Sequence, residues 1–312
     1  MTARVRAAET GGTPRDGWDD MAELRFSWVD VFAETPLTGN PLALVPDADA
    51  LSQSEMRAIA QEFNQSETTF LVTPSASGAD HRLRSFTAAG VEVLGAGHNA
   101  MGAWIWLADT GVLPPERNEF AQQIGDDVLP VWITRTSGGR SRVTMRQAAP
   151  RFLHSTTEHA DFAEALGLSP SVLADRPAEV VWTGAEHLML GLRTRADVDA
   201  AAPEPARLRA LLAGVGAEGC YVFTTESGAD GADAYSRFFN PTVGIVEDPA
   251  TGTAAGPLAA LLSRDGLAPG GSIRILQGHA MGRPSILEVA VDGDRVDLSG
   301  SGLVVADGVL RL

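Results

Sequence analysis

The feature that most constrains the fold is a helix that is apolar on every side. Residues 100–108 read Ala-Met-Gly-Ala-Trp-Ile-Trp-Leu-Ala, directly after the glycine-rich loop 95–99. A helix without a polar face must be buried, so other structure has to wrap around it. A second segment of small apolar residues, 254–262, follows the loop 247–253 about half a chain later. This repetition predicts two similar halves.

The segments around these two helices are mostly β. Alternating or β-branched runs between turn residues predict strands. The expected strands are 26–32, 41–45, 68–72, 82–87, 128–135, 142–146, 180–182, 188–192, 220–224, 237–239, 273–276, 286–291 and 296–298. Further helices are expected at 56–63, after a capping box that begins at Ser52, and at 158–166 and 205–212. The predicted fold class is therefore α+β, with two pseudo-symmetric domains that each wrap a mainly antiparallel sheet around a central apolar helix.

The low periodicity of residues 148–150 marks the predicted domain boundary. We expect residues 1–23 to be a disordered leader, 24–147 to form the N-terminal half and 148–312 the C-terminal half, with the last strand free to return to the first domain. Two similar halves would face each other across a cleft. Both central helices can then direct their N-termini, with free N–H groups and partial positive charge, at one ligand.

Charge and cysteine content narrow the class of function. The formal net charge is -16, which argues against nucleic acid or an anionic membrane as partner and favours a small molecule. No apolar stretch is long enough to span a membrane or to form a signal peptide, so a cytoplasmic protein is expected. The single cysteine, Cys220, excludes an internal disulfide, and the histidines lack the spacing of zinc sites. We therefore expect a metal-free active site.

Six short motifs carry a resemblance to a known family. In chain order they are 29–32 (V-D-V-F), 38–41 (T-G-N-P), 64–70 (N-Q-S-E-T-T-F), 96–98 (A-G-H), 247–254 (E-D-P-A-T-G-T-A) and 277–278 with 281–285 (Q-G and M-G-R-P-S). Together they resemble the PhzF-like, or phenazine-biosynthesis, family from about Leu24 almost to the C-terminus. The resemblance implies a diaminopimelate-epimerase-like fold with its site between the two domains, and a homodimer.

The resemblance also implies the residues of the site. Glu67 takes the position of the family glutamate that moves a proton between two ring carbons of a dihydro-hydroxyanthranilate. A carboxyl group in a closed, poorly solvated cleft has a raised pKa, so one residue can take a proton and return it. The substrate-binding positions that the family implies are Gly97, His98, Asp248, Gly252 and Thr253. Asp248 would bind an amino or hydroxyl group, whereas Gly252 and Thr253 would bind a carboxylate.

The predicted function is a cofactor-independent isomerase that acts on a small cyclic carboxylic or amino acid in secondary metabolism. A dehydratase or hydratase remains an alternative, because it needs the same glutamate. A non-catalytic binding homologue is a third reading, although it would be expected to lack Glu67 or His98, and both are present. Racemases and epimerases of the same fold use one cysteine from each helix loop, and neither 95–99 nor 251–253 contains a thiol.

Overall fold

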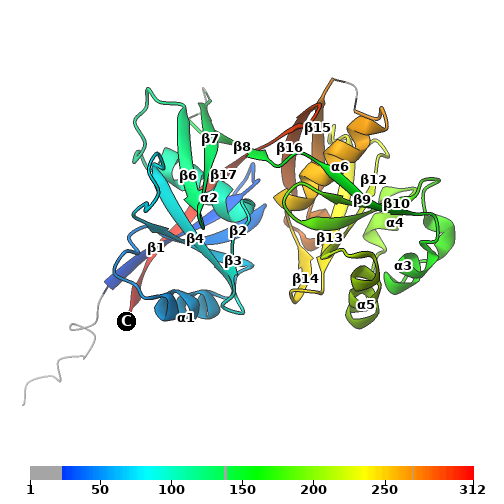
Figure 1. Cartoon of the computed structure of the whole chain (residues 1–312), viewed down its shortest axis with the longest axis horizontal. Coiled ribbons are helices and arrows are strands. Elements are labelled where there is room, and N and C mark those ends of the chain that lie inside the picture. Colours follow the sequence, from blue (N-terminus) through cyan, green and yellow to red (C-terminus); the bar gives the residue numbers. More distant parts are fainter. Residues whose placement is uncertain (1–22, 137–138, 269) are drawn as a thin grey trace, which may run out of the picture.

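The computed structural model of the chain describes residues 23–136, 139–268 and 270–312. Two halves of mixed strand and helix lie side by side, and strands run from one half into the other (Figure 1). The predicted leader lies outside the described residues except for its last position. Glu23 already belongs to the first strand, so the predicted end of the leader is one residue too late.

The first half is a sheet that closes on itself around one helix. Its elements are β1 (Glu23–Val31), β2 (Asn40–Val45), α1 (Gln53–Phe63), β3 (Glu67–Val72), β4 (His81–Thr87), β5 (Glu92–Val93), α2 (His98–Asp109), β6 (Glu119–Ile124), β7 (Asp127–Arg135) and β8 (Ser141–Gln147). The ring of pairs runs β1–β2–β3–β4–β6–β7–β8 and closes through β17 (Arg295–Arg311) back to β1. The pairs β2–β3 and β4–β6 are parallel, and the others are antiparallel.

The second half repeats this pairing scheme. Its elements are β9 (Arg151–Thr156), α3 (Ala160–Ala165), β10 (Ala178–Trp182), β11 (Glu186–Gly191), α4 (Arg195–Asp199), α5 (Pro205–Val215), β12 (Gly219–Thr224), β13 (Ala234–Asn240), β14 (Ile245–Asp248), α6 (Gly252–Arg264), β15 (Ser272–Gln277) and β16 (Ser285–Asp292). The parallel pairs β11–β12 and β13–β15 take the places of β2–β3 and β4–β6. Helix α6 connects β14 to β15 as α2 connects β5 to β6. The predicted fold class, with its two pseudo-symmetric halves, is confirmed.

The last strand, β17, belongs to both halves. Its first residues pair with β16 and with β8, and its residues from Gly302 onward pair with β1. The chain makes the reverse crossing where β8 ends at Gln147 and β9 begins at Arg151. Strand β17 therefore contributes to the sheets of both halves. The predicted domain boundary at residue 148 remains a prediction.

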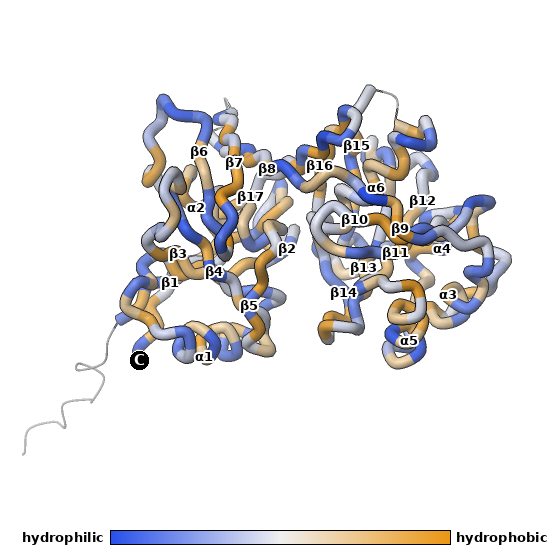
Figure 2. Tube along the Cα trace, in the orientation of Figure 1, coloured by the Kyte–Doolittle hydropathy of each residue, from blue (hydrophilic) through white to orange (hydrophobic). Residues whose placement is uncertain are grey.

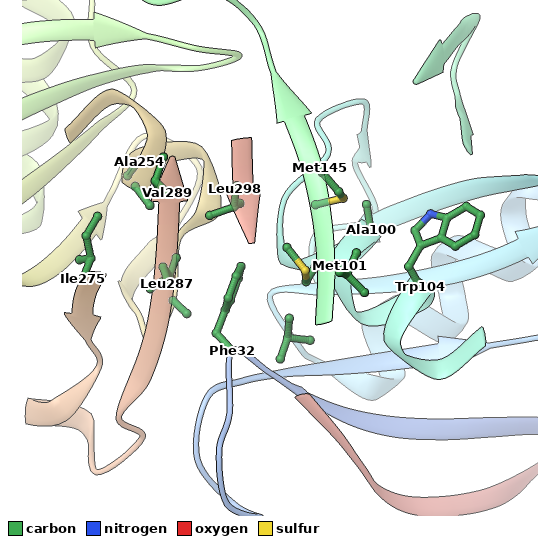
Figure 3. Packing of buried hydrophobic residues seen from close by; sticks show 14 of the residues in the cluster. Phe32, Ala100, Met101, Trp104, Met145, Ala254, Ile275, Leu287, Val289 and Leu298 are labelled. Carbon is green, nitrogen blue, oxygen red and sulfur yellow. The ribbon is translucent and has the colours of Figure 1, made fainter. Parts of the chain in front are cut away.

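The core is continuous between the two halves. Met101 and Trp104 of α2 are fully buried, and Trp104 Nε1 donates to Gln122 Oε1 at 2.8 Å, so its only donor is satisfied. Phe32 and Leu298 lie between this helix and the residues around α6 (Figure 3). By contrast, hydrophilic and hydrophobic residues interleave along α1, which buries one face only (Figure 2). No helix in the described ranges is long and apolar enough to cross a membrane.

Several elements were not predicted, and each has an unusual composition. Strand β6 carries two buried glutamines, and every residue of β9 is exposed or partly exposed. Strand β17 extends far beyond the predicted 296–298 through a run rich in glycine and serine. The structure explains this run, because a Cβ on Gly300 would lie 2.4 Å from Phe32 Cδ1. Only glycine lets the strand pass this close to the ring between the halves.

Gly102 gives a prediction about the packing of α2. A Cβ at this position would lie 2.5 Å from Leu42 Cδ2 and 2.7 Å from Val31 Cγ2, both in the surrounding sheet. Overpacking of this kind costs about 1–3 kcal/mol, which exceeds the roughly 0.5–1 kcal/mol that alanine gains over glycine in a helix. We therefore expect Gly102→Ala to lower the free energy of unfolding, measured by urea denaturation.

Gly214 in α5 provides the matched control for this prediction. A Cβ there would meet nothing within 4 Å. Gly214→Ala should therefore increase the free energy of unfolding by roughly 0.5–1 kcal/mol through helix propensity alone. Equal effects of the two substitutions would contradict the close packing described for α2.

Candidate active site

A cavity of about 530 Å³ lies between the two halves, at the starts of α2 and α6. Its volume is typical of small-molecule sites, which are roughly 300–1,000 Å³. The two helix starts approach closely, because a Cβ on Gly252 would lie 3.8 Å from Gly97 Cα. The structure brings all the predicted site residues to this cavity: Glu67, Gly97, His98, Asp248, Gly252 and Thr253. Their individual roles remain predictions.

The loop before α2 is shaped by its own side chains. Gly97 N donates to Asn99 Oδ1 at 2.8 Å, and Asn99 Nδ2 donates to the Gly95 carbonyl at 3.0 Å. This arrangement places His98 in the first turn of the helix. Neither α2 nor α6 has a side-chain cap at its N-terminus. In α6, Ala254 N donates to the Thr251 carbonyl at 3.1 Å, so the N–H groups of Gly252 and Thr253 are the ones available there to a bound anion. The dipoles of both helices also favour an anion at this place.

Glu67 and His98 form the first pair of titratable groups. Glu67 Oε2 lies 3.1 Å from His98 Nε2, and the two side chains are only 15% and 8% exposed. The contact is not aligned as a hydrogen bond, so neither atom has a hydrogen-bond partner among the described residues. Burial raises the pKa of Glu67 to about 7. Burial also lowers the pKa of His98, although nearby Asp248 opposes this change. At neutral pH Glu67 can therefore gain or lose a proton beside a neutral imidazole.

Asp248, the last residue of β14, is the second buried carboxyl group. Its Oδ1 accepts a hydrogen bond from Asn40 Nδ2 at 2.9 Å, and its Oδ2 accepts one from the Thr251 hydroxyl. Burial raises the pKa of Asp248 to about 6, against the opposing effects of His98 and of these hydrogen bonds. Asn40 comes from the first half of the molecule and Asp248 from the second. This hydrogen bond therefore joins the two halves at the base of the cavity.

His187 lines the same cavity and was not among the predicted site residues. Its Nε2 lies 3.2 Å from Thr253 Oγ1, and its ring packs edge-on against Phe238 with centroids 4.9 Å apart. Burial lowers the pKa of His187 to about 3, so the imidazole is neutral and positions the Thr253 hydroxyl. A lone histidine on a strand gives no motif from which this role could be predicted.

Asn40, Ser66 and Thr251 were also missed as site residues, although they lie within the motifs quoted above. Ser66 Oγ is 3.5 Å from Asp248 Oδ1, and Thr251 donates to the other oxygen of the same carboxylate. The motifs were therefore the signal that could have identified them.

Cys220 lies on β12 away from the cavity lining, and burial raises the pKa of its thiol to about 12. It is not placed to act as an acid or base.

The cavity is polar at its base and apolar toward its sides. Val91 and Val93 line it from the first half, and Val243 and Ile245 line it from the second. Among the described lining residues none is Arg or Lys, so the partial positive charge of the two helix N-termini is what the cavity offers to an anionic ligand. Within the described ranges no group of three or more His, Cys, Asp or Glu side chains is arranged to hold a metal ion. The arrangement suits a small molecule that carries a negative charge.

Comparison with known proteins agrees with this geometry. Residues 29–308 match the family model of phenazine biosynthesis-like proteins. The trans-2,3-dihydro-3-hydroxyanthranilate isomerase of Pseudomonas aeruginosa is 36% identical over 91% of this chain and 98% of its own length. A predicted epimerase from the same organism has 32% identity and a TM-score of 0.79, covering 92% of this chain and 99% of that one. A PhzF-family protein of Bacillus anthracis has a TM-score of 0.84 at 24% identity, covering 93% and 99% of the two chains.

The closed sheets around two central helices have the diaminopimelate-epimerase-like fold of these structures, and the curated relatives show that the chain is an isomerase. Within this class, the chain belongs to the phenazine biosynthesis-like (PhzF) family.

Proposed function

We propose that this isomerase moves a proton between two carbons of a small cyclic carboxylic or amino acid, without a cofactor, and that Glu67 is its general acid and base. One observation carries the proposal. Glu67 is a buried carboxyl group without a hydrogen-bond partner among the described residues, and its pKa of about 7 lies at the pH where it must work. The similarity to trans-2,3-dihydro-3-hydroxyanthranilate isomerase supports the same substrate class.

The proposed reaction uses one carboxyl group twice, first as a base and then as an acid. Ionised Glu67 takes a proton from one ring carbon, and the electron pair of that C–H bond shifts along the adjacent double bond. The carboxyl group of Glu67 then gives the proton to the carbon at the other end of the shifted system, so no atom is gained or lost. The helix N-termini at Gly97 and Gly252 bind the substrate carboxylate, and Asp248 accepts a hydrogen bond from its amino or hydroxyl group.

Reaction in D2O tests this proposal. With trans-2,3-dihydro-3-hydroxyanthranilate as substrate, NMR of the product should show deuterium at the newly protonated carbon. Incorporation should fall below one atom, because a proton returned within a closed cavity exchanges incompletely with solvent. Loss of the substrate hydroxyl as water would instead indicate a dehydratase. If neither this compound nor its carboxylic-acid analogues undergo C–H exchange, the chain is a binding protein and the proposal is wrong.

The same proposal includes a homodimer in the cytoplasm. The family resemblance supports the dimer. A reducing compartment is supported by the single cysteine of the chain, which is buried and free.

A further inference from the structure

Gln277, at the end of β15, uses every hydrogen-bonding position of its side chain. Its Nε2 donates to the Asp248 carbonyl at 2.7 Å and to Thr251 Oγ1 at 3.1 Å. Its Oε1 accepts from Thr251 N at 3.1 Å and from the Tyr221 hydroxyl at 2.8 Å. A side-chain amide offers two donors and two acceptor positions, so Gln277 is saturated. It is also completely buried, so water does not compete for these bonds.

The orientation of this amide is determined by its partners. The backbone N–H of Thr251 can only donate, and the backbone carbonyl of Asp248 can only accept. Rotating the Gln277 amide by half a turn would place donor against donor and acceptor against acceptor. Ser236 Oγ donates to the Tyr221 hydroxyl at 2.8 Å, which leaves the Tyr221 proton for Gln277 Oε1. The buried chain of Ser236, Tyr221 and Gln277 therefore has one direction of donation.

The direction of donation in this chain also determines which hydrogen-bond donors face the carboxylate of Asp248. Because Thr251 Oγ1 accepts from Gln277, its own proton is directed to Asp248 Oδ2. Asn40 Nδ2, which can only donate, occupies Asp248 Oδ1. Both oxygens of Asp248 thus face hydrogen-bond donors, whereas Glu67 Oε2 has none among the described residues. The two buried carboxyl groups of the cavity are therefore in opposite environments.

We propose that Gln277 is a positioning residue that fixes the Thr251 hydroxyl as a donor to Asp248 and so keeps Asp248 a hydrogen-bond acceptor toward the ligand. The proposal rests on the proposed function, in which Asp248 binds the substrate and Glu67 carries the proton. Gln277 itself is not a lining residue of the cavity. It acts only through Thr251 and through the backbone of the loop 248–251.

The titratable groups that face Asp248 come from three other elements. They are His98 at the start of α2, Glu67 at the start of β3 and Tyr221 on β12. Burial and the negative charge of Glu67 raise the pKa of Asp248, whereas His98 and the hydrogen bonds of Thr251 and Asn40 lower it. Weakening the hydrogen bond from Thr251 should therefore raise the pKa of Asp248 further. The direction of this change is the signature that a purely structural role of Gln277 would not produce.

The experiment is a titration of the Asp248 carboxyl carbon by NMR, in protein labelled with 13C at the aspartate Cγ. Asp248→Asn identifies the signal. Gln277→Met removes both amide donors without adding a charge, so the Thr251 hydroxyl is no longer fixed as a donor to Asp248. In Thr251→Val the intermediate hydroxyl is removed. Both changes should raise the pKa of Asp248 by roughly one pH unit, since one hydrogen bond is worth about 1 kcal/mol or more.

Steady-state kinetics provides the second readout. With trans-2,3-dihydro-3-hydroxyanthranilate, both variants should show a higher KM, because a rise of the Asp248 pKa from about 6 by roughly one unit lowers the ionised fraction of this carboxyl group. The increase in KM should be about twofold at pH 7 and approach tenfold near pH 5, and the acid limb of kcat/KM should move to higher pH. Gln122→Met is the matched control. Gln122 is a buried glutamine on β6 in the other half, so its substitution perturbs the core but should leave the pKa of Asp248 unchanged.

An unchanged pKa of Asp248 in a folded Gln277→Met protein would overturn the proposal, and so would an unchanged pKa in Thr251→Val. Gln277→Asn, which draws the amide back from Thr251, decides the question if Gln277→Met does not fold. An equal rise of this pKa in Gln122→Met would also overturn the proposal, because the effect would then come from general loosening of the core. Failure of the proposed function appears separately, as wild-type protein that gives no C–H exchange, and the NMR titration does not depend on turnover.

Discussion

Glu67→Gln should lower kcat by about 100-fold to 10,000-fold and leave ligand affinity nearly unchanged. General acid–base catalysis by one positioned side chain typically contributes this much. Glutamine has the shape of a protonated glutamate but cannot take up or release a proton at neutral pH. Turnover of trans-2,3-dihydro-3-hydroxyanthranilate and calorimetric binding of 3-hydroxyanthranilate, its aromatic analogue, measure the two quantities. Turnover within tenfold of wild type would contradict the role of Glu67.

Glu218→Gln is the matched control, because Glu218 is exposed at the edge of the same cavity and its substitution should not affect kcat.

The pH dependence of stability gives a second check that the Glu67→Gln protein is folded. Burial raises the pKa of Glu67 from 4.5 to about 7, so the folded state binds the proton more tightly than the unfolded state. Stability is therefore lost as the pH rises through this interval, by roughly 3 kcal/mol above it. Glu67→Gln removes this loss, so it should raise the Tm at pH 8 and have little effect at pH 4.

The fold could be predicted because its two central helices are apolar on every side. Segments 100–108 and 254–262 can only be buried. Their repetition half a chain apart predicts two halves with a similar fold. The buried parts of α2 and α6 agree with this reading. The positions of Glu67 and Asp248 were predictable for a different reason, since they lie in motifs that a whole family shares.

Buried polar residues account for most of what the sequence did not reveal. Gln122 and Gln123 make β6 look like a surface segment, yet both side chains are buried. Each is stabilised by a partner from a distant part of the chain: Trp104 donates to Gln122, and the Ser75 backbone donates to Gln123. His187 was missed for the same reason. A pattern of apolar residues cannot distinguish a buried, hydrogen-bonded polar side chain from an exposed one, because the difference depends on the partner.

Asp248→Ala should weaken the binding of a ligand that carries an amino group next to its carboxylate. A hydrogen bond to a charged group is worth about 1.5–3 kcal/mol, so the affinity for 3-hydroxyanthranilate should fall roughly tenfold to a hundredfold. The substitution does not leave Asn40 without a partner, because Asn40 Nδ2 also donates to the Ala250 carbonyl at 2.9 Å. The loss should therefore report mainly on the contact with the ligand.

A second ligand identifies which group Asp248 binds. 3-Hydroxybenzoate lacks only the amino group, so its affinity should change less than about threefold in Asp248→Ala if the amino group is the partner. A loss as large as that of 3-hydroxyanthranilate would assign Asp248 to the hydroxyl group instead. Asp294→Ala, in the exposed turn between β16 and β17, is the matched control and should bind both ligands as wild type does. Since Asp248 and Glu67 come from different halves, unchanged affinity of Asp248→Ala for both ligands would show that the ligand does not lie between them.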